Sequence, residues 1–202
     1  MAAPSLRDVE WQISYGPSDD RLNSFYIPAL QRSVQYDRSA GFFSSSALAV
    51  AAAGVAGLIA NGGSMRLLVG AQLSREDVEA IKCGAELEGI IAEKLIAALD
   101  QPVEDLLRRR VEILAWMVAQ GTLQIRVVLP RDANGLPVPA DQAQDYYHPK
   151  EGVFTDAEGN QVAFSGSVNE SMTGWQRNYE QFSVYFSWDG SHPYLRQVAH
   201  RF

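Results

Sequence analysis

Strand-like segments alternate with helix-like segments over the first 130 residues of this 202-residue chain. The strand-like runs occupy residues 35–43, 65–70 and 122–129, and runs with apolar residues at three- and four-residue spacing lie between them. A strand followed by a helix and a second strand forms a βαβ unit, in which the two strands are parallel. This order therefore predicts an α/β fold with a mainly parallel sheet.

The remaining segments extend this pattern. Residues 1–20 are polar and broken by Pro and Gly, which predicts an arm or an edge strand. We expect three further strands after residue 130, the first two joined by a turn at Glu158-Gly159-Asn160, and they span residues 146–154, 161–165 and 180–188. Helices are expected at residues 20–33, 47–60, 78–99, 102–119 and 191–202, with Pro28 bending the first and serine hydroxyls at 44–46 capping the second. The sheet should therefore be mixed, mainly parallel and flanked by helices.

Composition excludes several classes of protein. The net charge of −7 is incompatible with a generally basic surface, so a polyanion must bind at a local patch. One cysteine, Cys83, allows neither an internal disulfide nor a zinc–thiolate cluster, which favours a reduced, cytoplasmic protein. The N-terminus lacks the layout of a signal peptide, and the most apolar stretch, residues 47–60, is shorter than the roughly 20 residues that span a bilayer.

The length predicts one domain over residues 1–202, with residues 1–20 as its N-terminal arm. The helix-like segment at residues 191–202 stops without a capping residue. We therefore expect the native polypeptide to continue beyond residue 202.

The strongest chemical signal lies between residues 148 and 180. His148 and Lys150 are separated by one proline, the sequence GSVN brings Ser167 and Asn169, and Glu180 follows. A neutral imidazole can attack phosphorus, and a neighbouring ammonium offsets the phosphate charge. Hydroxyl and amide groups can donate to the phosphate oxygens, and a carboxylate can orient the imidazole through its other nitrogen. This set predicts phosphodiester transfer without a metal or a cofactor.

The order of these residues resembles the phospholipase D superfamily. Its signature is HxK, four residues, Asp, six residues and GSxN, with an acidic residue about ten positions later. The stretch HPKEGVFTDAEGNQVAFSGSVNESMTGWQRNYE is most similar to phospholipase D-like nuclease domains of bacterial helicase and restriction-type proteins, and SAGFFSSSALAVAAAGV with MRLLVG resembles the opening of that fold. The resemblance implies a nuclease that cleaves DNA or RNA through a phosphohistidine on His148.

The chain departs from the family pattern at the aspartate. Thr155 occupies its position, and Asp156 lies one residue late, which along a strand moves a side chain to the opposite face. Two alternatives follow. A bulge brings Asp156 back to the family position, or Asp156 opens the hairpin turn.

A single HxK motif supplies a nucleophile but no second histidine to protonate the leaving alcohol. The other histidines, His192 and His200, have no lysine two residues later. The resemblance therefore implies a homodimer with one active site across its two-fold axis, as in members with a single motif.

Other features leave alternatives open. Trp175 and Arg177 lie between GSVN and Glu180, where they suit substrate binding by stacking on a base, or a lid over the core. Three arginines at 108–110 suit phosphate binding, although a solvated helix face balanced by Glu104 and Asp105 is favoured. A rival function is a catalytically weak nucleic-acid-binding module of a helicase or restriction/defence protein. A lipid-directed enzyme is disfavoured because no amphipathic basic face is evident. The choice between DNA and RNA, strandedness and sequence preference stay open.

Overall fold

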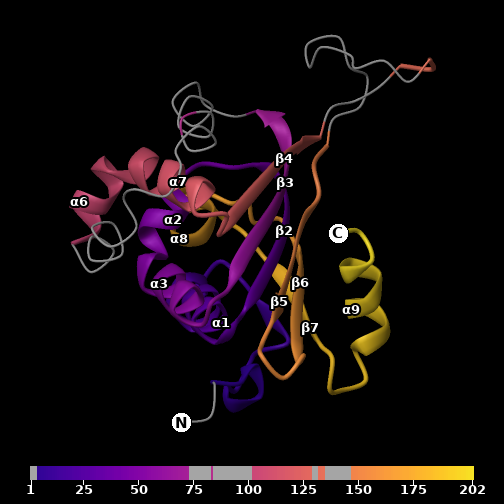
Figure 1. The fold of residues 1–202 in the computed structure, drawn as a ribbon. Helices are drawn as coiled ribbons and strands as arrows, with labels where there is room; N and C mark the ends of the chain where they lie inside the picture. Colours follow the sequence, from indigo (N-terminus) through magenta and orange to yellow (C-terminus); the bar gives the residue numbers. More distant parts are fainter. Residues whose placement is uncertain (1–3, 73–82, 84–101, 129–131, 135–146) are drawn as a thin grey trace.

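The computed structural model describes residues 4–72, 83, 102–128, 132–134 and 147–202 (Figure 1). In this part of the chain, seven strands form one sheet with the order β1-β7-β6-β5-β2-β3-β4. The strands are β1 (Ser14–Tyr15), β2 (Gln35–Phe42), β3 (Ser64–Gln72), β4 (Leu123–Val128), β5 (Lys150–Thr155), β6 (Gln161–Gly166) and β7 (Phe182–Phe186). Apart from Cys83, the helix expected at 78–99 lies outside the described residues.

The expectation of a mainly parallel sheet is wrong. Among the described strands, β2–β3 and β3–β4 pair in parallel, whereas β2–β5, β5–β6, β6–β7 and β1–β7 are antiparallel. The βαβ order correctly predicted the parallel half. The C-terminal hairpin then joins β2 from the other side, and antiparallel pairs outnumber parallel ones. The N-terminal arm contains β1, which is one of the two edge strands of the described sheet.

Helices cover the two sheet faces unequally (Figure 1). One face packs against α1 (Ile27–Arg32), α2 (Ser46–Val50), α3 (Ala52–Ala60), α6 (Val103–Arg108), α7 (Arg110–Ala119) and α8 (Met172–Gln176). On the opposite face, α9 (His192–Ala199) buries Leu195 and Val198 against Val153 of β5 and Ala163 of β6. None of the helices in the described part of the chain is long and apolar enough to cross a membrane.

Three of the predicted helices are more broken than expected. The segment at 20–33 begins with a π-helical turn, η2 (Leu22–Tyr26), in which the Ile27 N–H donates to the Leu22 carbonyl, and α1 follows around Pro28. The segment at 47–60 breaks at Ala51 between α2 and α3, and that at 102–119 breaks at Arg109. The break at Ala51 lets α3 pack along α1 while α2 packs against α8. Tertiary packing here overrides the high helix propensity of alanine.

The serine cap predicted for the helix at residue 47 differs in detail. Ser45 is the residue that precedes α2, but its side chain makes no capping hydrogen bond. Instead, Ser44 Oγ accepts from the Ser46 N–H at 3.4 Å, and Ser46 Oγ accepts from the Met172 N–H at 3.3 Å. The serines therefore join the start of α2 to α8. At the far end of α3, Gly62 has φ +69°, a conformation that favours glycine and ends the helix.

Candidate active site

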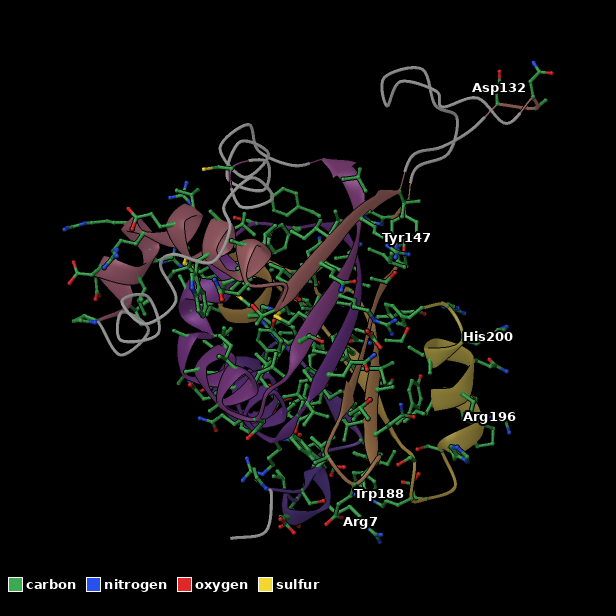
Figure 2. All side chains as sticks on the ribbon, in the orientation of Figure 1. Arg7, Asp132, Tyr147, Trp188, Arg196 and His200 are labelled. Carbon is green, nitrogen blue, oxygen red and sulfur yellow. The ribbon has the colours of Figure 1, made fainter. Side chains whose placement is uncertain are left out.

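The HPK motif lies where β5 begins. Lys150 is the first residue of β5 and pairs with Ala40 of β2, and His148 precedes the strand. The expectation that both residues belong to one strand is therefore wrong for His148. Figure 2 labels its neighbour Tyr147 at the end of the sheet opposite to Arg7 and Trp188. The Tyr147 hydroxyl hydrogen-bonds to the Ser39 hydroxyl, which fixes this segment against β2.

His148 and Lys150 are in direct contact although only one of them is in the strand. Lys150 Nζ lies 3.0 Å from His148 Nδ1 and 3.0 Å from Nε2, and it also donates to the His148 carbonyl at 3.3 Å. The histidine is exposed, whereas the lysine is only 8% exposed. A neutral imidazole can accept a hydrogen bond from an ammonium group, so the pair presents a nucleophile next to a positive charge.

Gly41 makes room for the histidine, a role that the sequence analysis missed. A Cβ atom on Gly41 would lie 2.6 Å from His148 Cδ2 and 3.2 Å from its Cα. Both distances are shorter than ordinary contacts, and the second involves backbone. Any larger residue at position 41 therefore displaces His148.

The GSVN motif forms a loop between β6 and α8 that approaches the end of β2. Asn169 Oδ1 accepts from the Phe42 N–H at 3.1 Å, which turns its amide NH₂ away from β2 as a donor. Ser167 Oγ accepts from the Gln181 N–H at 3.0 Å and lies 3.3 Å from the Gln181 carbonyl. Since β6 pairs with β5, the loop lies one strand away from Lys150.

Glu180 is buried just before β7. Its Oε1 accepts from Asn178 Nδ2 at 3.1 Å. Arg21, only 2% exposed, fixes the same segment by donating to the carbonyls of Glu180 at 3.2 Å and Asn178 at 2.9 Å. Sequence reasoning missed Arg21, because nothing in the local sequence distinguishes it from a surface arginine.

A second buried arginine supports the GSVN loop. Arg38 Nε donates to Glu170 Oε2 at 2.8 Å, and Nη2 donates to the Val168 carbonyl. Tyr26 donates to the other Glu170 oxygen, and Tyr36 donates to Oε2 at 3.2 Å. Burial, and after it the Glu170 charge, raise the pKa of both tyrosines well above 10, so their hydroxyls stay protonated as donors. This network was also missed.

Electrostatic interactions reach from this network to the lysine. Burial, and after it the Arg38 charge, lower the pKa of Lys150 from 10.5, while the Glu180 charge opposes this shift. Arg38 pairs with Gly152 of β5, two residues from Lys150, so both cations lie on the same face of the sheet. The site therefore combines one lysine, two supporting arginines and two buried carboxylates.

Asp156 does not reach the site, and the bulge expected as one alternative is absent from β5, whose register is continuous. Asp156 opens the hairpin turn, which was the other alternative. Its carboxylate accepts from Leu6 N at 2.9 Å, Ser5 Oγ at 2.8 Å and Asn160 N at 2.9 Å. It lies six residues along the strand from Lys150, which is about 20 Å. Thr155 is half-buried beside it and accepts from Gln161 Nε2.

Trp175 lies in the core, so its predicted stacking on a substrate base is wrong and the core alternative holds. It is 1% exposed and stacks on Tyr26 with ring centroids 4.1 Å apart. Arg177, at the end of α8, is exposed. Arg108 and Arg109 pair along their own helices with Asp105 and Glu112, which agrees with a solvated helix face. Among the described residues, no three His, Cys, Asp or Glu side chains are grouped as a metal site.

A comparison with solved structures shows the fold. The sequence matches no protein-family model and no curated protein. NucT from Helicobacter pylori, a phospholipase D superfamily member, aligns over 93% of this chain and 90% of its own, with a TM-score of 0.51 and 13% identity.

Two further solved structures are more distant. Phosphatidylserine synthase from Haemophilus influenzae aligns over 92% of this chain and 35% of its own, with a TM-score of 0.46 and 19% identity. Yeast tyrosyl-DNA phosphodiesterase aligns over 77% and 26%, with a TM-score of 0.40 and 8% identity. This chain thus spans about a third or less of those two proteins, and at these TM-scores neither adds to the argument. The likeness to NucT shows that the chain has the fold of the phospholipase D superfamily.

Proposed function

We propose that the protein is a phosphodiesterase that cleaves DNA or RNA. The observation that carries this proposal is the Lys150 ammonium, 3.0 Å from both ring nitrogens of the exposed His148. An accessible imidazole beside a desolvated cation suits attack on a phosphodiester, whose negative charge otherwise repels nucleophiles. The phospholipase D-like fold supports the same chemistry.

The reaction has two steps. A ring nitrogen of His148 forms a bond to phosphorus while the bond from phosphorus to the leaving alcohol breaks. His148 of the partner subunit donates a proton to that alcohol. A water molecule then attacks the phosphohistidine and gives its proton to His148 of the partner subunit, which releases the phosphate monoester and restores both histidines.

The other motif residues bind and orient. Lys150, Ser167 and Asn169 contact the nonbridging oxygens, and the Asn169 amide is directed as a donor by its bond from Phe42 N–H. Glu180 orients the His148 ring. Its burial and its electrostatic interaction with Lys150 support a position close to the pair. Arg177, exposed at the end of α8, contacts the nucleic-acid strand.

The assembly that this mechanism requires is a homodimer with a composite site, because one chain carries one HxK motif. An attached helicase or restriction domain and a cytoplasmic location stay predictions.

A binding module is the second candidate function. It is favoured by Thr155, which stands where the family has an aspartate. Asp156 does not take over the position of that aspartate, because it binds the N-terminal arm instead. In that case the same residues hold a phosphate of the nucleic acid and position an attached helicase or restriction domain on it.

Hydrolysis of bis(p-nitrophenyl) phosphate in excess EDTA tests the enzyme against the module. We expect turnover by the wild type, its loss in His148→Ala, and no change in His200→Ala, a matched variant on the exposed end of α9. Binding of an oligonucleotide by His148→Ala should stay within a few fold of the wild type, since the covalent bond forms mainly in the transition state. Binding without turnover by the wild type favours the module, and loss of activity in EDTA with recovery in magnesium contradicts the mechanism.

A further inference from the structure

A groove of about 390 Å³ crosses β6, β7 and β1, and Ser167 is the candidate-site residue in its lining. We call it the serine groove, and its polar lining is Ser14, Ser165, Ser167, Gln181 and Ser183. Ser167 belongs both to this groove and to the proposed phosphate-binding set. Neighbouring strands are about 4.8 Å apart, so the groove reaches roughly 10 Å from β6 to the sheet edge at β1.

The strand register places these polar groups side by side. Ser165 of β6 pairs with Ser183 of β7, which pairs with Ser14 of β1. Ser167 lies two residues after Ser165, just past the end of β6, and Gln181 lies two residues before Ser183, just ahead of β7. The Gln181 N–H donates to the Ser167 hydroxyl. Residues that pair directly share a face, so Ser14, Ser165 and Ser183 lie on the face of Glu151, opposite to Lys150, and Ser167 and Gln181 continue this lining at the end of the sheet.

The groove offers hydrogen bonds but no charge. Ser14, Ser183 and Gln181 are exposed, and the hydroxyls of Ser14 and Ser183 hydrogen-bond to no residue in the described part of the chain. No Asp, Glu, Lys or Arg is among the lining residues. The Ser165 hydroxyl donates to Glu151, whose charge is paired with Arg201.

These properties suit a polar chain more than a lipid. Tyr15 and Phe182 contribute to the lining but are 1% and 2% exposed, so they offer almost no apolar surface to an acyl chain. Sugar and phosphate oxygens can use the exposed hydroxyls and amide, and no carboxylate in the lining repels a polyanion. The volume lies within the roughly 300–1,000 Å³ that small-molecule sites occupy.

We propose that the serine groove binds the nucleotide next to the scissile phosphate and leads the nucleic-acid strand away from Ser167 toward β1. This inference rests on the proposed function and adds the residues that distinguish a polynucleotide from a small diester.

The test fills the groove without touching the candidate catalytic residues. Ser183→Leu and Ser14→Leu add bulk at two exposed positions, and Ser18→Leu is the matched control at an exposed serine outside the lining. Each variant is assayed on a short single-stranded oligonucleotide and on bis(p-nitrophenyl) phosphate. Oligonucleotide affinity is also measured by fluorescence anisotropy in the His148→Ala background, so binding is read without turnover.

We expect both groove variants to lose about tenfold in oligonucleotide cleavage and affinity, and to hydrolyse the small diester at the wild-type rate. If the groove variants cleave and bind the oligonucleotide as well as Ser18→Leu does, the groove is not a nucleotide subsite, and the proposed phosphodiesterase activity is unaffected. If the wild type cleaves neither substrate, the proposed phosphodiesterase function fails. A tenfold loss of oligonucleotide affinity in the groove variants would then still support binding in the serine groove.

Two further outcomes assign the groove to another occupant. Cleavage of phosphatidylcholine vesicles but not of the oligonucleotide overturns the polynucleotide subsite. A change of oligomeric state in Ser183→Leu, seen by light scattering, assigns the groove to contact between subunits and overturns it equally.

Discussion

Arg38 and Glu170 form a completely buried ion pair, with Arg38 Nε 2.8 Å from Glu170 Oε2 and both side chains 0% exposed. Glu170 directly follows Asn169, and the Arg38 guanidinium also donates to the Val168 carbonyl. This ion pair, which has no access to water, therefore anchors the GSVN loop to β2. Tyr26 and Tyr36 donate two further hydrogen bonds to the carboxylate.

Removing one member of this pair leaves the other charged and buried. We expect Glu170→Ala to lower the free energy of unfolding by about 3–5 kcal/mol. Tyr26→Phe removes one hydrogen bond to a charged group and should cost about 1.5–3 kcal/mol. Denaturant unfolding of both variants measures these losses. Glu112→Ala breaks the exposed pair with Arg109 and should cost about 1 kcal/mol or less. An effect of Glu170→Ala no larger than that of Glu112→Ala contradicts the role of the buried pair.

Local sequence patterns predicted the elements better than their pairing. The strand expected at 35–43 is β2, but its antiparallel partner β5 begins 115 positions after β2 starts, at Lys150, and periodicity carries no information on that choice. The break at Ala51 had no local signal either, since alanine is the best helix former. The prediction of a mainly parallel sheet was wrong because periodicity does not show which strands pair with each other.

The sequence likewise predicted some residues of the candidate site and missed others. The motif predicted that His148 and Lys150 meet, because the spacing itself carries that information. Arg38, Arg21 and Glu170 were missed because a buried charge and a solvated one have the same letter in a sequence. A signal did exist for Arg38. It lies two residues from Tyr36 and two from Ala40 in a strand, so it shares the face that those residues bury.

Asp156 anchors the N-terminal arm and should affect stability rather than catalysis. Burial raises the pKa of its carboxyl, but hydrogen bonds from Leu6, Asn160 and Ser5 outweigh this and lower it. Because the folded pKa is below the unfolded one, this stabilisation is present above the unfolded value of about 3.9 and is lost as pH falls through the folded value.

We therefore expect Asp156→Ala to lower the free energy of unfolding at pH 7 by about 1–3 kcal/mol. Denaturant unfolding at pH 7 and at acid pH measures this cost, which should shrink as the pH falls. Turnover per folded molecule should be unchanged, with Glu10→Ala, an exposed acid on the same arm, as the control. Loss of turnover by the folded variant is evidence that Asp156 does act on the site.

Lys150 should set the alkaline limit of activity. Burial and the Arg38 charge lower its pKa from 10.5, so the ammonium loses its proton, and activity falls, at a lower pH than for an exposed lysine. The Glu180 charge raises this pKa, so Glu180→Gln should move the alkaline limb of the pH–rate profile to lower pH. Glu104→Gln, at an exposed position of α6, should leave the limb in place. Identical limbs in the wild type and Glu180→Gln indicate that another group controls the alkaline limit.

The composite site can be tested by mixing subunits. Each phosphate needs His148 from both chains, so a dimer of one wild-type and one His148→Ala subunit should be inactive. When equal amounts exchange freely, about a quarter of the dimers keep two wild-type subunits, so activity per total protein should fall to about a quarter of the wild-type value. Mixing with His200→Ala should cause no such loss. Light scattering should give a mass of twice 22.2 kDa. A mixture that retains about half of the activity shows instead that each subunit works alone, and the proton for the leaving alcohol must then come from another group of the same chain.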